Sequence, residues 1–192
     1  MRVIPKLSQY LQGICDAVNR SDLTDAFESA RDLLLETQSK IRTVYVGGNG
    51  GSAAIANHLC CDFMKGSGIK TVSLSSNVPL ITAIGNDYGY QQVLAKQLGY
   101  LGCSGDVVIL ISSSGQSANI KQAVIEAKSK GIKIIGLSGF DGGYLADNSD
   151  ISLHVNYDNY GIVEDVHQML MHSLAQSVVA ANETSGSTIS GR

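Results

Sequence analysis

The stretch TVYVGGNGGS, residues 43–52, joins a short β-branched run to a loop with four glycines and then to a helical segment. A run of this composition is typical of a buried strand. The glycines permit positive φ angles and close approach of backbone N–H groups to an anion, and the following helix adds the positive end of its dipole. The stretch therefore predicts a strand, a turn and a helix that begins near Ser52. Such a turn either binds phosphate or serves only for tight packing, and phosphate binding is favoured here.

Four more short β-branched runs follow along the chain, and segments of helical pattern separate them. Parallel strands need crossover connections, and near-continuous apolar runs suit strands that helices cover on both faces. The alternation therefore predicts an α/β fold with a parallel sheet, in which ligands bind beyond the carboxyl ends of the strands. The four runs are residues 71–74, 107–111, 132–137 and 151–155.

The two ends of the chain differ from this middle part. Residues 4–39 carry apolar side chains at helical spacing, which predicts two helices joined near Ser21 and Asp22, either of which suits the N-cap of the second helix. Residues 182–192 are small and polar and bury too little area to order themselves, so we expect a flexible tail, with docking onto a neighbouring subunit as the alternative. Residues 1–181 are expected to form a single domain.

Composition excludes several classes of partner. The 14 basic and 17 acidic residues give a net charge of -3, which offers no basic field for nucleic acid. No stretch approaches the roughly 18 to 20 apolar residues of a membrane-spanning helix, and the first residues have no signal-peptide core, so we expect a cytoplasmic protein. The four cysteines are scattered and are expected to be small buried hydrophobes without a redox role: Cys15, Cys60, Cys61 and Cys103.

A second loop, SSSGQS at residues 112–117, follows the strongest of the predicted strands. Four serines within six residues, with Gly115 for the turn, place several hydroxyl donors at a helix N-terminus, which suits a phosphate monoester. A serine-rich turn is more often simple capping. Its position after a buried strand, which repeats the geometry of the first loop, favours phosphate binding. Neither a P-loop nor a dinucleotide fingerprint is present, so no nucleotide cofactor is expected.

Four motifs in this order resemble the SIS (sugar isomerase) domain of phosphoheptose isomerases: residues 47–52, 83–90, 111–119 and 137–143. The resemblance implies a three-layer αβα, flavodoxin-like fold with a five-stranded parallel sheet. An N-terminal helical hairpin would serve oligomer packing in a homotetramer with active sites at subunit interfaces. The implied reaction converts sedoheptulose 7-phosphate to D-glycero-D-manno-heptose 7-phosphate, for nucleotide-activated heptose synthesis.

The same resemblance assigns the substrate-binding residues within the two loops and the second motif. Serines would hold the phosphate, the glycine backbone of the first loop would belong to the same site, and an amide and a carboxylate would lie beside the sugar hydroxyls. In that order the residues are Ser52, Ser112, Ser114 and Ser117 with Ser113 nearby; Gly50 and Gly51; and Asn49 and Asp87.

Two polar stripes offer groups for the chemistry. Isomerising a ketose to an aldose requires a base beside the carbonyl, and an acid or a metal to stabilise the enediolate oxygen. His58 and Asp62 are four residues apart and share one helix face, and Glu164, Gln168 and His172 form a stripe on the last helix. Two such stripes on two helices are able to converge.

The resemblance implies that this convergence holds a zinc ion. The family commonly has His and Glu on the first of these helices and Gln and His on the last, and the matching residues here are His58, Asp62, Glu164 and His172. All four are able to ligate zinc. Asp62 is one methylene shorter than the family's base, so Glu164 either holds the metal or takes over as base. Asp62, Glu164 and His172 are therefore the candidate catalytic residues.

Two further departures from the family pattern concern the substrate. Gly66 and Gly161 stand where the family often has Arg and Asp, and the nearby Lys65 and Asp158 are candidate substitutes, so a related sugar phosphate is an alternative substrate.

Two other histidines and two other functional classes need weighing. His167 and His154 are expected to be satisfied core or interface histidines rather than ligands. The alternatives to an isomerase are a sugar-phosphate-binding regulator and a non-catalytic SIS interaction module. No helix-turn-helix segment is attached, and Asp62 keeps a carboxylate on the first helix, which favours catalysis.

Overall fold

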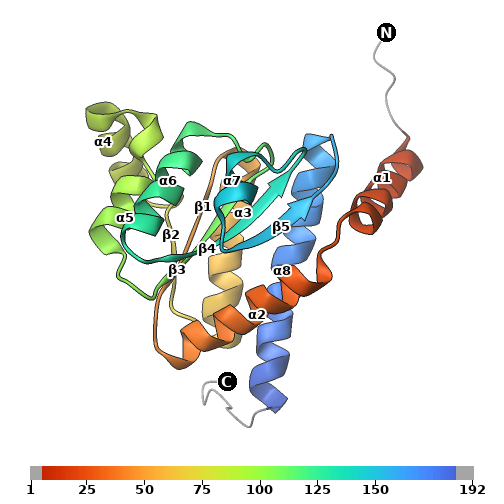
Figure 1. The fold of residues 1–192 in the computed structure, drawn as a ribbon, viewed down its shortest axis with the longest axis horizontal. Coiled ribbons are helices and arrows are strands. Elements are labelled where there is room, and N and C mark those ends of the chain that lie inside the picture. The colour runs from red at the N-terminus through yellow and green to blue at the C-terminus, as the bar shows by residue number, and fades with distance from the viewer. Residues whose placement is uncertain (1–5, 185–192) are drawn as a thin grey trace.

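The computed structural model describes residues 6–184, and its centre is a five-stranded parallel sheet (Figure 1). The strand order is β2-β1-β3-β4-β5, with every neighbouring pair parallel. This confirms the predicted α/β class and the flavodoxin-like order. The strands are β1 (Val44–Gly48), β2 (Thr71–Ser73), β3 (Val107–Ser112), β4 (Lys133–Gly139) and β5 (Ile151–Val155).

Helices cover both faces of the sheet, which gives the three layers. One face carries α1 (Leu7–Arg20), α2 (Thr24–Ser39), α3 (Gly50–Asp62), the π-helical turn η1 (Phe63–Ser67) and α8 (Tyr160–Thr184). The other face carries α4 (Val78–Tyr88), the 3₁₀ turn η2 (Tyr90–Gln92), α5 (Ala95–Leu101), α6 (Ala118–Ser129) and α7 (Gly143–Asn148).

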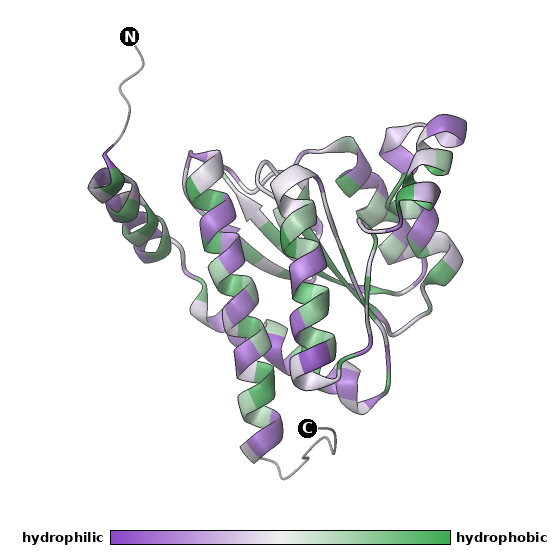
Figure 2. Cartoon of the chain, turned by 180° about the vertical axis from the view of Figure 1, so that it is seen from behind, coloured by the Kyte–Doolittle hydropathy of each residue, from purple (hydrophilic) through white to green (hydrophobic). Residues whose placement is uncertain are grey.

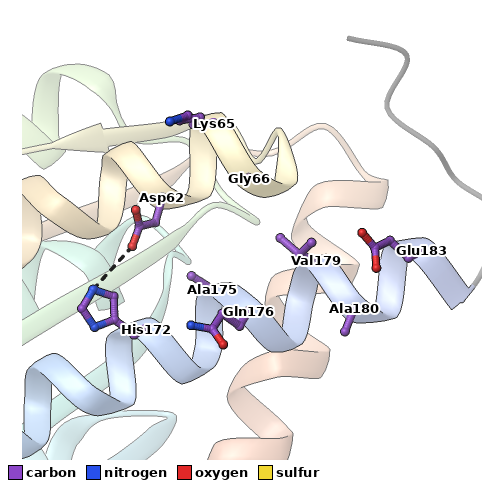
Figure 3. A pocket seen from close by; sticks show the side chains of 9 residues that line it. All are labelled: Asp62, Lys65, Gly66, His172, Ala175, Gln176, Val179, Ala180 and Glu183. Carbon is purple, nitrogen blue, oxygen red and sulfur yellow. Dashed lines mark ion pairs between the residues drawn. The ribbon is translucent and has the colours of Figure 1, made fainter. Parts of the chain in front are cut away.

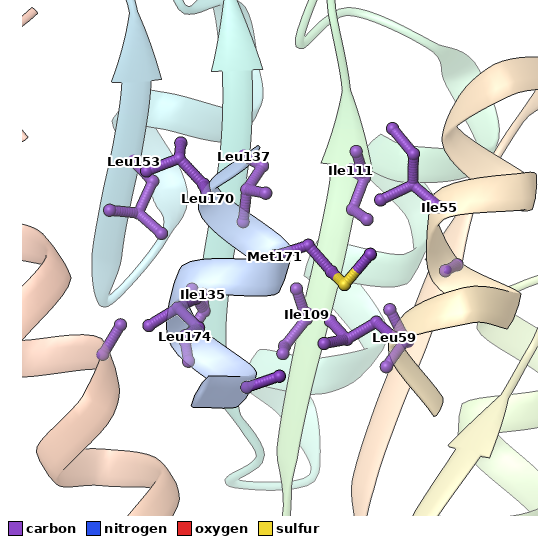
Figure 4. Close-up of a cluster of buried hydrophobic side chains, with 14 of the residues drawn as sticks. Ile55, Leu59, Ile109, Ile111, Ile135, Leu137, Leu153, Leu170, Met171 and Leu174 are labelled. Carbon is purple, nitrogen blue, oxygen red and sulfur yellow. The ribbon is translucent and has the colours of Figure 1, made fainter. Parts of the chain in front are cut away.

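The strands form because their side chains are buried on both sides. Every residue of β1 and β3 is buried, as the near-continuous apolar runs predict for central parallel strands. Figure 4 shows the core on the α8 side, where Met171 and Leu174 of α8 and Leu59 of α3 pack onto Ile109 and Ile135. This packing fixes α3 and α8 side by side on one face, as Figure 2 shows from behind.

The two N-terminal helices are present, but their main contacts are with α8 rather than with each other. Figure 1 shows α1 reaching outward from the body of the molecule. The predicted caps of the second helix are wrong, because Leu23 occupies the N-cap of α2 and makes no side-chain capping bond. Ser21 instead donates its hydroxyl to Ala17 O at 2.6 Å and accepts the N–H of Asn156 at 3.0 Å. It thus ties the end of α1 to the loop after β5.

The helix α8 is longer than the sequence pattern predicts. It runs to Thr184, so residues 182–184 of the predicted tail are helical, and residues 185–192 lie outside the described part of the chain. Within residues 6–184, no helix has the length and apolar character needed to cross a membrane.

The cysteines correct another expectation. Only Cys60 is buried, whereas the other three are exposed on this chain: Cys15, Cys61 and Cys103. Burial raises the pKa of the Cys60 thiol to about 12, which keeps it protonated and unreactive. The exposed three lie on the surfaces of α1 and α3 and in the loop after α5.

Candidate functional site

The two predicted phosphate loops lie next to each other at the carboxyl edge of the sheet. This follows from the pairing of β1 with β3, in which Gly48 is the partner of Ile111. One loop leads into α3 and the other into α6, so two helix N-termini meet at this edge. Backbone N–H groups and the positive dipole ends of both helices therefore point toward one place, which suits an anion.

The glycines of the first loop serve both packing and conformation. A Cβ on Gly48 would lie 2.7 Å from the Cβ of Ser52, so the chain turns too tightly there for a side chain. Gly50 has a φ of 52°, and a Cβ added to it would meet nothing within 4 Å, so its role is conformational. Asn49 is the N-cap residue of α3, and Ser52 is only 4% exposed in its first turn.

The serine hydroxyls of the second loop are not all used in helix-capping hydrogen bonds. Ser117 is the N-cap residue of α6 but makes no side-chain capping bond. Ser112 and Ser113 are buried, and within the described chain the Ser113 hydroxyl has no hydrogen-bond partner. The Ser114 hydroxyl accepts the N–H of Gln116 at 3.3 Å. Because a buried hydroxyl without a partner is costly, the unpaired Ser113 favours a ligand over simple capping.

A pair of asparagines connects the two loops. Asn49 Nδ2 donates to Asn119 Oδ1 at 2.9 Å, and Asn119 Nδ2 donates to Asn49 Oδ1 at 2.7 Å. Asn49 Oδ1 also accepts the Tyr90 hydroxyl at 2.9 Å. Sequence reasoning missed the roles of Asn119 and Tyr90, although both lie inside the family-like motifs, because nothing local shows which loop they reach.

Among the described residues, Asp87 makes no hydrogen bond to either phosphate loop. It is exposed in the last turn of α4, where one carboxylate oxygen accepts the side-chain amide of Asn86 at 2.8 Å. The chain then passes through Gly89, with a φ of 85°, to Tyr90. The hydrogen bond from Tyr90 to Asn49 places this segment at the border of the first loop.

Three of the four predicted metal ligands converge between α3 and α8. Asp62 Oδ1 lies 3.5 Å from His58 Nε2, and Asp62 Oδ2 lies 3.9 Å from His172 Nε2. The two imidazole rings meet edge to face with centroids 5.1 Å apart. One ligand atom of each residue lies within 4.8 Å of the other two. Figure 3 shows Asp62 and His172 pointing toward each other from the two helices.

Glu164 is not a member of this group. Its carboxylate lies against Gly51, where an added Cβ would be 2.5 Å from Glu164 Oε2. Glu164 therefore faces the start of α3, whereas His172, about 12 Å further along α8 at a rise of about 1.5 Å per residue, faces its end. Between them, Gln168 Nε2 lies 3.3 Å from His172 Nε2. The stripe exists as predicted, but it spans two different parts of the site.

A groove of about 760 Å³ continues from the three-residue group along the seam between η1 and the second half of α8. Lys65, proposed as a substitute for the family's arginine, lines it with Asp62, His172 and Gly66 (Figure 3). At the other departure, a Cβ on Gly161 would lie 2.8 Å from the Tyr10 hydroxyl, so Tyr10 fills the space of a side chain there.

Asp158 lies elsewhere, lining a separate hollow of about 350 Å³ with Arg20 and Tyr157 beyond β5. The Tyr10 hydroxyl donates to Asp165 at 2.8 Å, and burial together with this carboxylate raises the pKa of Tyr10 to about 12.

The remaining histidines hold backbone carbonyls. His167 is fully buried, and its Nε2 lies 3.0 Å from Ser138 O. Burial lowers the pKa of His167 to about 4, so its ring is neutral near pH 7. His154 Nε2 lies 2.9 Å from Phe140 O. Both are held by the protein as expected, although Nδ1 of His167 is buried without a hydrogen-bond partner among the described residues.

Comparison with known proteins places this geometry in a family. SIS domain models match residues 9–139 and 102–181. Phosphoheptose isomerase of Geotalea uraniireducens is 35% identical over 158 residues, covering 80% of this chain and 84% of that protein. Phosphoheptose isomerase of Helicobacter pylori (strain Shi470) is 37% identical over 151 residues, covering 76% and 79%. The structure of phosphoheptose isomerase GmhA from Neisseria gonorrhoeae superposes with a TM-score of 0.84 at 31% identity, covering 90% of this chain and 94% of the other.

Proposed function

The chain belongs to the SIS-domain family of phosphoheptose isomerases, and we propose that it converts sedoheptulose 7-phosphate into D-glycero-D-manno-heptose 7-phosphate. One observation carries this proposal. The first phosphate loop leads into α3, and His58 and Asp62 lie further along the same helix, where His172 of α8 joins them. The substrate has its groups in the same order, with the phosphate at one end of a seven-carbon chain and the reacting carbons at the other.

The phosphate is assigned to the carboxyl edge of β1 and β3. We assign it to Ser52, Ser112, Ser113, Ser114 and Ser117, which lie in the two loops and at the helix N-termini there, together with the backbone of Gly50 and Gly51. Hydroxyl donors and helix dipoles hold a phosphate dianion without a lysine or an arginine. This matches a chain whose net charge is -3.

The reacting carbons are assigned to the three-residue group. At a rise of about 1.5 Å per residue, His58 lies about 9 Å and Asp62 about 15 Å along α3 from Ser52. Side chains on a helix lean toward its N-terminus, so both reach back toward the bound phosphate. A group two to three turns from the phosphate suits a reaction at the far end of the sugar.

Proton transfer is assigned to Asp62 and the two imidazoles. Asp62 would remove a proton from C1 of the ketose and return it to C2, through an enediolate. When no metal is bound, His58 and His172, with nitrogens 3.5 and 3.9 Å from the two oxygens of Asp62, would exchange protons with the two sugar oxygens. With zinc bound, the two imidazoles would be ligands instead. The carbon and oxygen protons balance, and no oxidant or reductant is needed.

The donor set of this group also fits zinc. Two imidazoles and one carboxylate are a ligand set of catalytic zinc sites, which keep a further position open. Zinc held there would supply Lewis acidity to a sugar oxygen. We assign the metal to His58, Asp62 and His172. The contact of Glu164 with Gly51 supports a role for Glu164 toward the sugar rather than toward the metal.

A homotetramer in which the N-terminal helices contact other subunits is supported by one face of α1. Leu7, Leu11 and Val18 are 74%, 52% and 38% exposed and recur at helical spacing. An apolar stripe of this kind on a projecting helix favours burial against another copy. We assign residues 1–181 to a single SIS domain that includes α1.

The test is direct turnover. Purified protein is incubated with sedoheptulose 7-phosphate, with and without added zinc, and the aldose is followed by ¹³C NMR at C1. Appearance of the aldose C1 signal is the expected result. Binding of the sugar phosphate without turnover in any metal would contradict the isomerase and support a sugar-phosphate sensor.

A further inference from the structure

Asn49 is the most heavily connected polar side chain at the substrate site. Its carboxamide oxygen accepts hydrogen bonds from the Tyr90 hydroxyl and from Asn119 Nδ2, which uses both lone pairs. Its nitrogen donates one hydrogen to Asn119 Oδ1. Among the described residues no acceptor takes the second hydrogen. A residue assigned beside the sugar hydroxyls is thus committed mainly to other protein groups.

The orientation of this amide pair is determined by the backbone of α6. Asn119 Oδ1 also accepts the N–H of Ile120 at 3.1 Å, so the oxygen and not the nitrogen of Asn119 must face that helix turn. Asn49 must then present its nitrogen to Asn119 Oδ1 and its oxygen to Asn119 Nδ2. The remaining N–H of Asn49 is the one group it offers to a ligand, and that group binds an acceptor oxygen.

The two partners of Asn49 differ in burial. Asn119 is 3% exposed, in the first turn of the helix that follows the serine loop. Tyr90 is 59% exposed, three residues after Asp87 on the segment between α4 and α5. The first partner therefore links the two phosphate loops from inside the protein. The second links the Asp87 segment to the first loop from the surface.

We propose that Asn119 and Tyr90 are positioning residues for substrate binding, acting through Asn49. Asn119 fixes the separation of the two phosphate loops, and the Tyr90 hydroxyl holds the Asp87 segment over the sugar. The proposal rests on the proposed function for the identity of the sugar. It predicts that loss of Asn119 weakens phosphate binding itself, whereas loss of the Tyr90 hydroxyl weakens only binding of the sugar part.

The sharper variant is Tyr90→Phe, because it removes one hydroxyl from an exposed ring and leaves the fold intact. Its matched control is Tyr100→Phe, at a tyrosine that is 60% exposed on α5. We expect KM for sedoheptulose 7-phosphate to rise about fivefold in Tyr90→Phe, the usual effect of one lost hydrogen bond, with kcat within about twofold. The dissociation constant for inorganic phosphate, measured by calorimetry, should not change. Tyr100→Phe should match the wild type in all three values.

Asn119→Ala tests the proposed role of Asn119 in phosphate binding. Here the dissociation constant for inorganic phosphate and KM should both rise about tenfold or more, since two hydrogen bonds between the loops are lost. Asn119→Asp, which keeps the acceptor for Ile120 but loses the donor to Asn49, should show the same direction of change. A purely structural residue would lower the melting temperature and leave both constants unchanged.

The outcomes separate this proposal from the proposed function. Wild-type protein that binds inorganic phosphate but does not isomerise the heptose phosphate would contradict the proposed function. The dissociation constants for inorganic phosphate would still decide the role of Asn119. Wild-type KM in Tyr90→Phe overturns the role of Tyr90. If Asn119→Ala does not fold, unchanged phosphate binding in Asn119→Asp overturns the role of Asn119.

Discussion

The carboxylate of Glu164 lies directly over the Cα of Gly51, at the N-terminal turn of α3. A Cβ on Gly51 would be 2.5 Å from Oε2, 2.9 Å from Cδ and 3.0 Å from Oε1 of Glu164. The positive end of the α3 dipole stabilises a negative group at this position. Gly51 thus leaves room for the carboxylate of a residue more than a hundred positions later in the chain.

Gly51→Ala should therefore impair the site without unfolding the protein. The new methyl group displaces the flexible end of Glu164 from the first turn of α3, so we expect kcat/KM to fall about tenfold, which corresponds to about 1.4 kcal/mol of lost stabilisation of the bound sugar. Gly66→Ala is the control, since its Cβ would meet only Val179 Cγ2 at 3.3 Å. Equal activity in the two variants would show that the contact between Gly51 and Glu164 has no bearing on catalysis.

Asp62→Asn and Glu164→Gln distinguish the two carboxylates. Glu164→Gln keeps the shape of the side chain beside Gly51, so we expect kcat within about threefold of wild type. Asp62→Asn removes the assigned base, and loss of general base catalysis lowers kcat by about 10² to 10⁴. Rates are measured with sedoheptulose 7-phosphate at saturating concentration. The reverse ranking of the two variants would transfer the base to Glu164.

Zinc content tests the metal assignment independently of activity. His58→Ala and His172→Ala should each lose bound zinc, measured by metal analysis after dialysis against a weak chelator, because each removes one of three ligands. Glu164→Ala should retain it. Glu183→Ala, at a carboxylate that lines the same groove outside the group, is the matched control. Loss of zinc from Glu164→Ala would make Glu164 a fourth ligand.

The sequence predicts what local chemistry controls and fails where distant helices meet. The strand Ile151–Val155 and the two anion loops follow from β-branched runs and from glycine and serine turns, which depend on neighbours in the chain. Glu164 and His172 share a helix face, so their common stripe was predictable. Which end of that stripe meets Asp62 depends on how α8 packs beside α3, and spacing along one helix carries no such information.

The link between Asn49 and Asn119 failed to emerge for the same reason, since it joins residues 70 positions apart. The N-cap of α2 shows that a local preference is also able to mislead. Ser21 is a suitable cap in isolation, but the backbone of Asn156 and Ala17 takes its hydroxyl. A tertiary contact there overrides a local preference.

Leu11→Glu should break the proposed assembly without damaging the chain fold. Leu11 is 52% exposed on α1, so a charge there is tolerated in the isolated chain but not in a buried interface. We expect light scattering to show the tetramer dissociate, with an unchanged far-UV circular dichroism spectrum. The control is Gln9→Glu, which places the same charge two positions away on α1 and keeps the side-chain oxygen that accepts the N–H of Lys6. A tetramer that persists in Leu11→Glu would remove this face of α1 from the interface.

His167 should make the folded state sensitive to mild acid. Burial lowers its pKa from 6.5 to about 4, so between these values the unfolded chain binds a proton that the folded chain does not. The free energy of unfolding from this group is therefore complete above pH 6.5 and is lost as pH falls toward 4. Linkage gives a loss of about 2 kcal/mol between pH 7 and pH 5, measured by urea denaturation.

The matched variant for this effect is His167→Gln, which does not titrate and whose amide nitrogen reaches the place of Nε2, so that it keeps a donor for Ser138 O. Carboxylates elsewhere in the chain titrate equally in both proteins, so the difference between their pH dependences isolates His167. The variant should be less stable than wild type at pH 7, because the smaller side chain leaves a cavity beneath β4. Its stability should nevertheless fall less between pH 7 and pH 5. Parallel curves would show that the pKa of His167 is the same in the folded and unfolded chains, in conflict with a ring that is fully buried against Ser138 O.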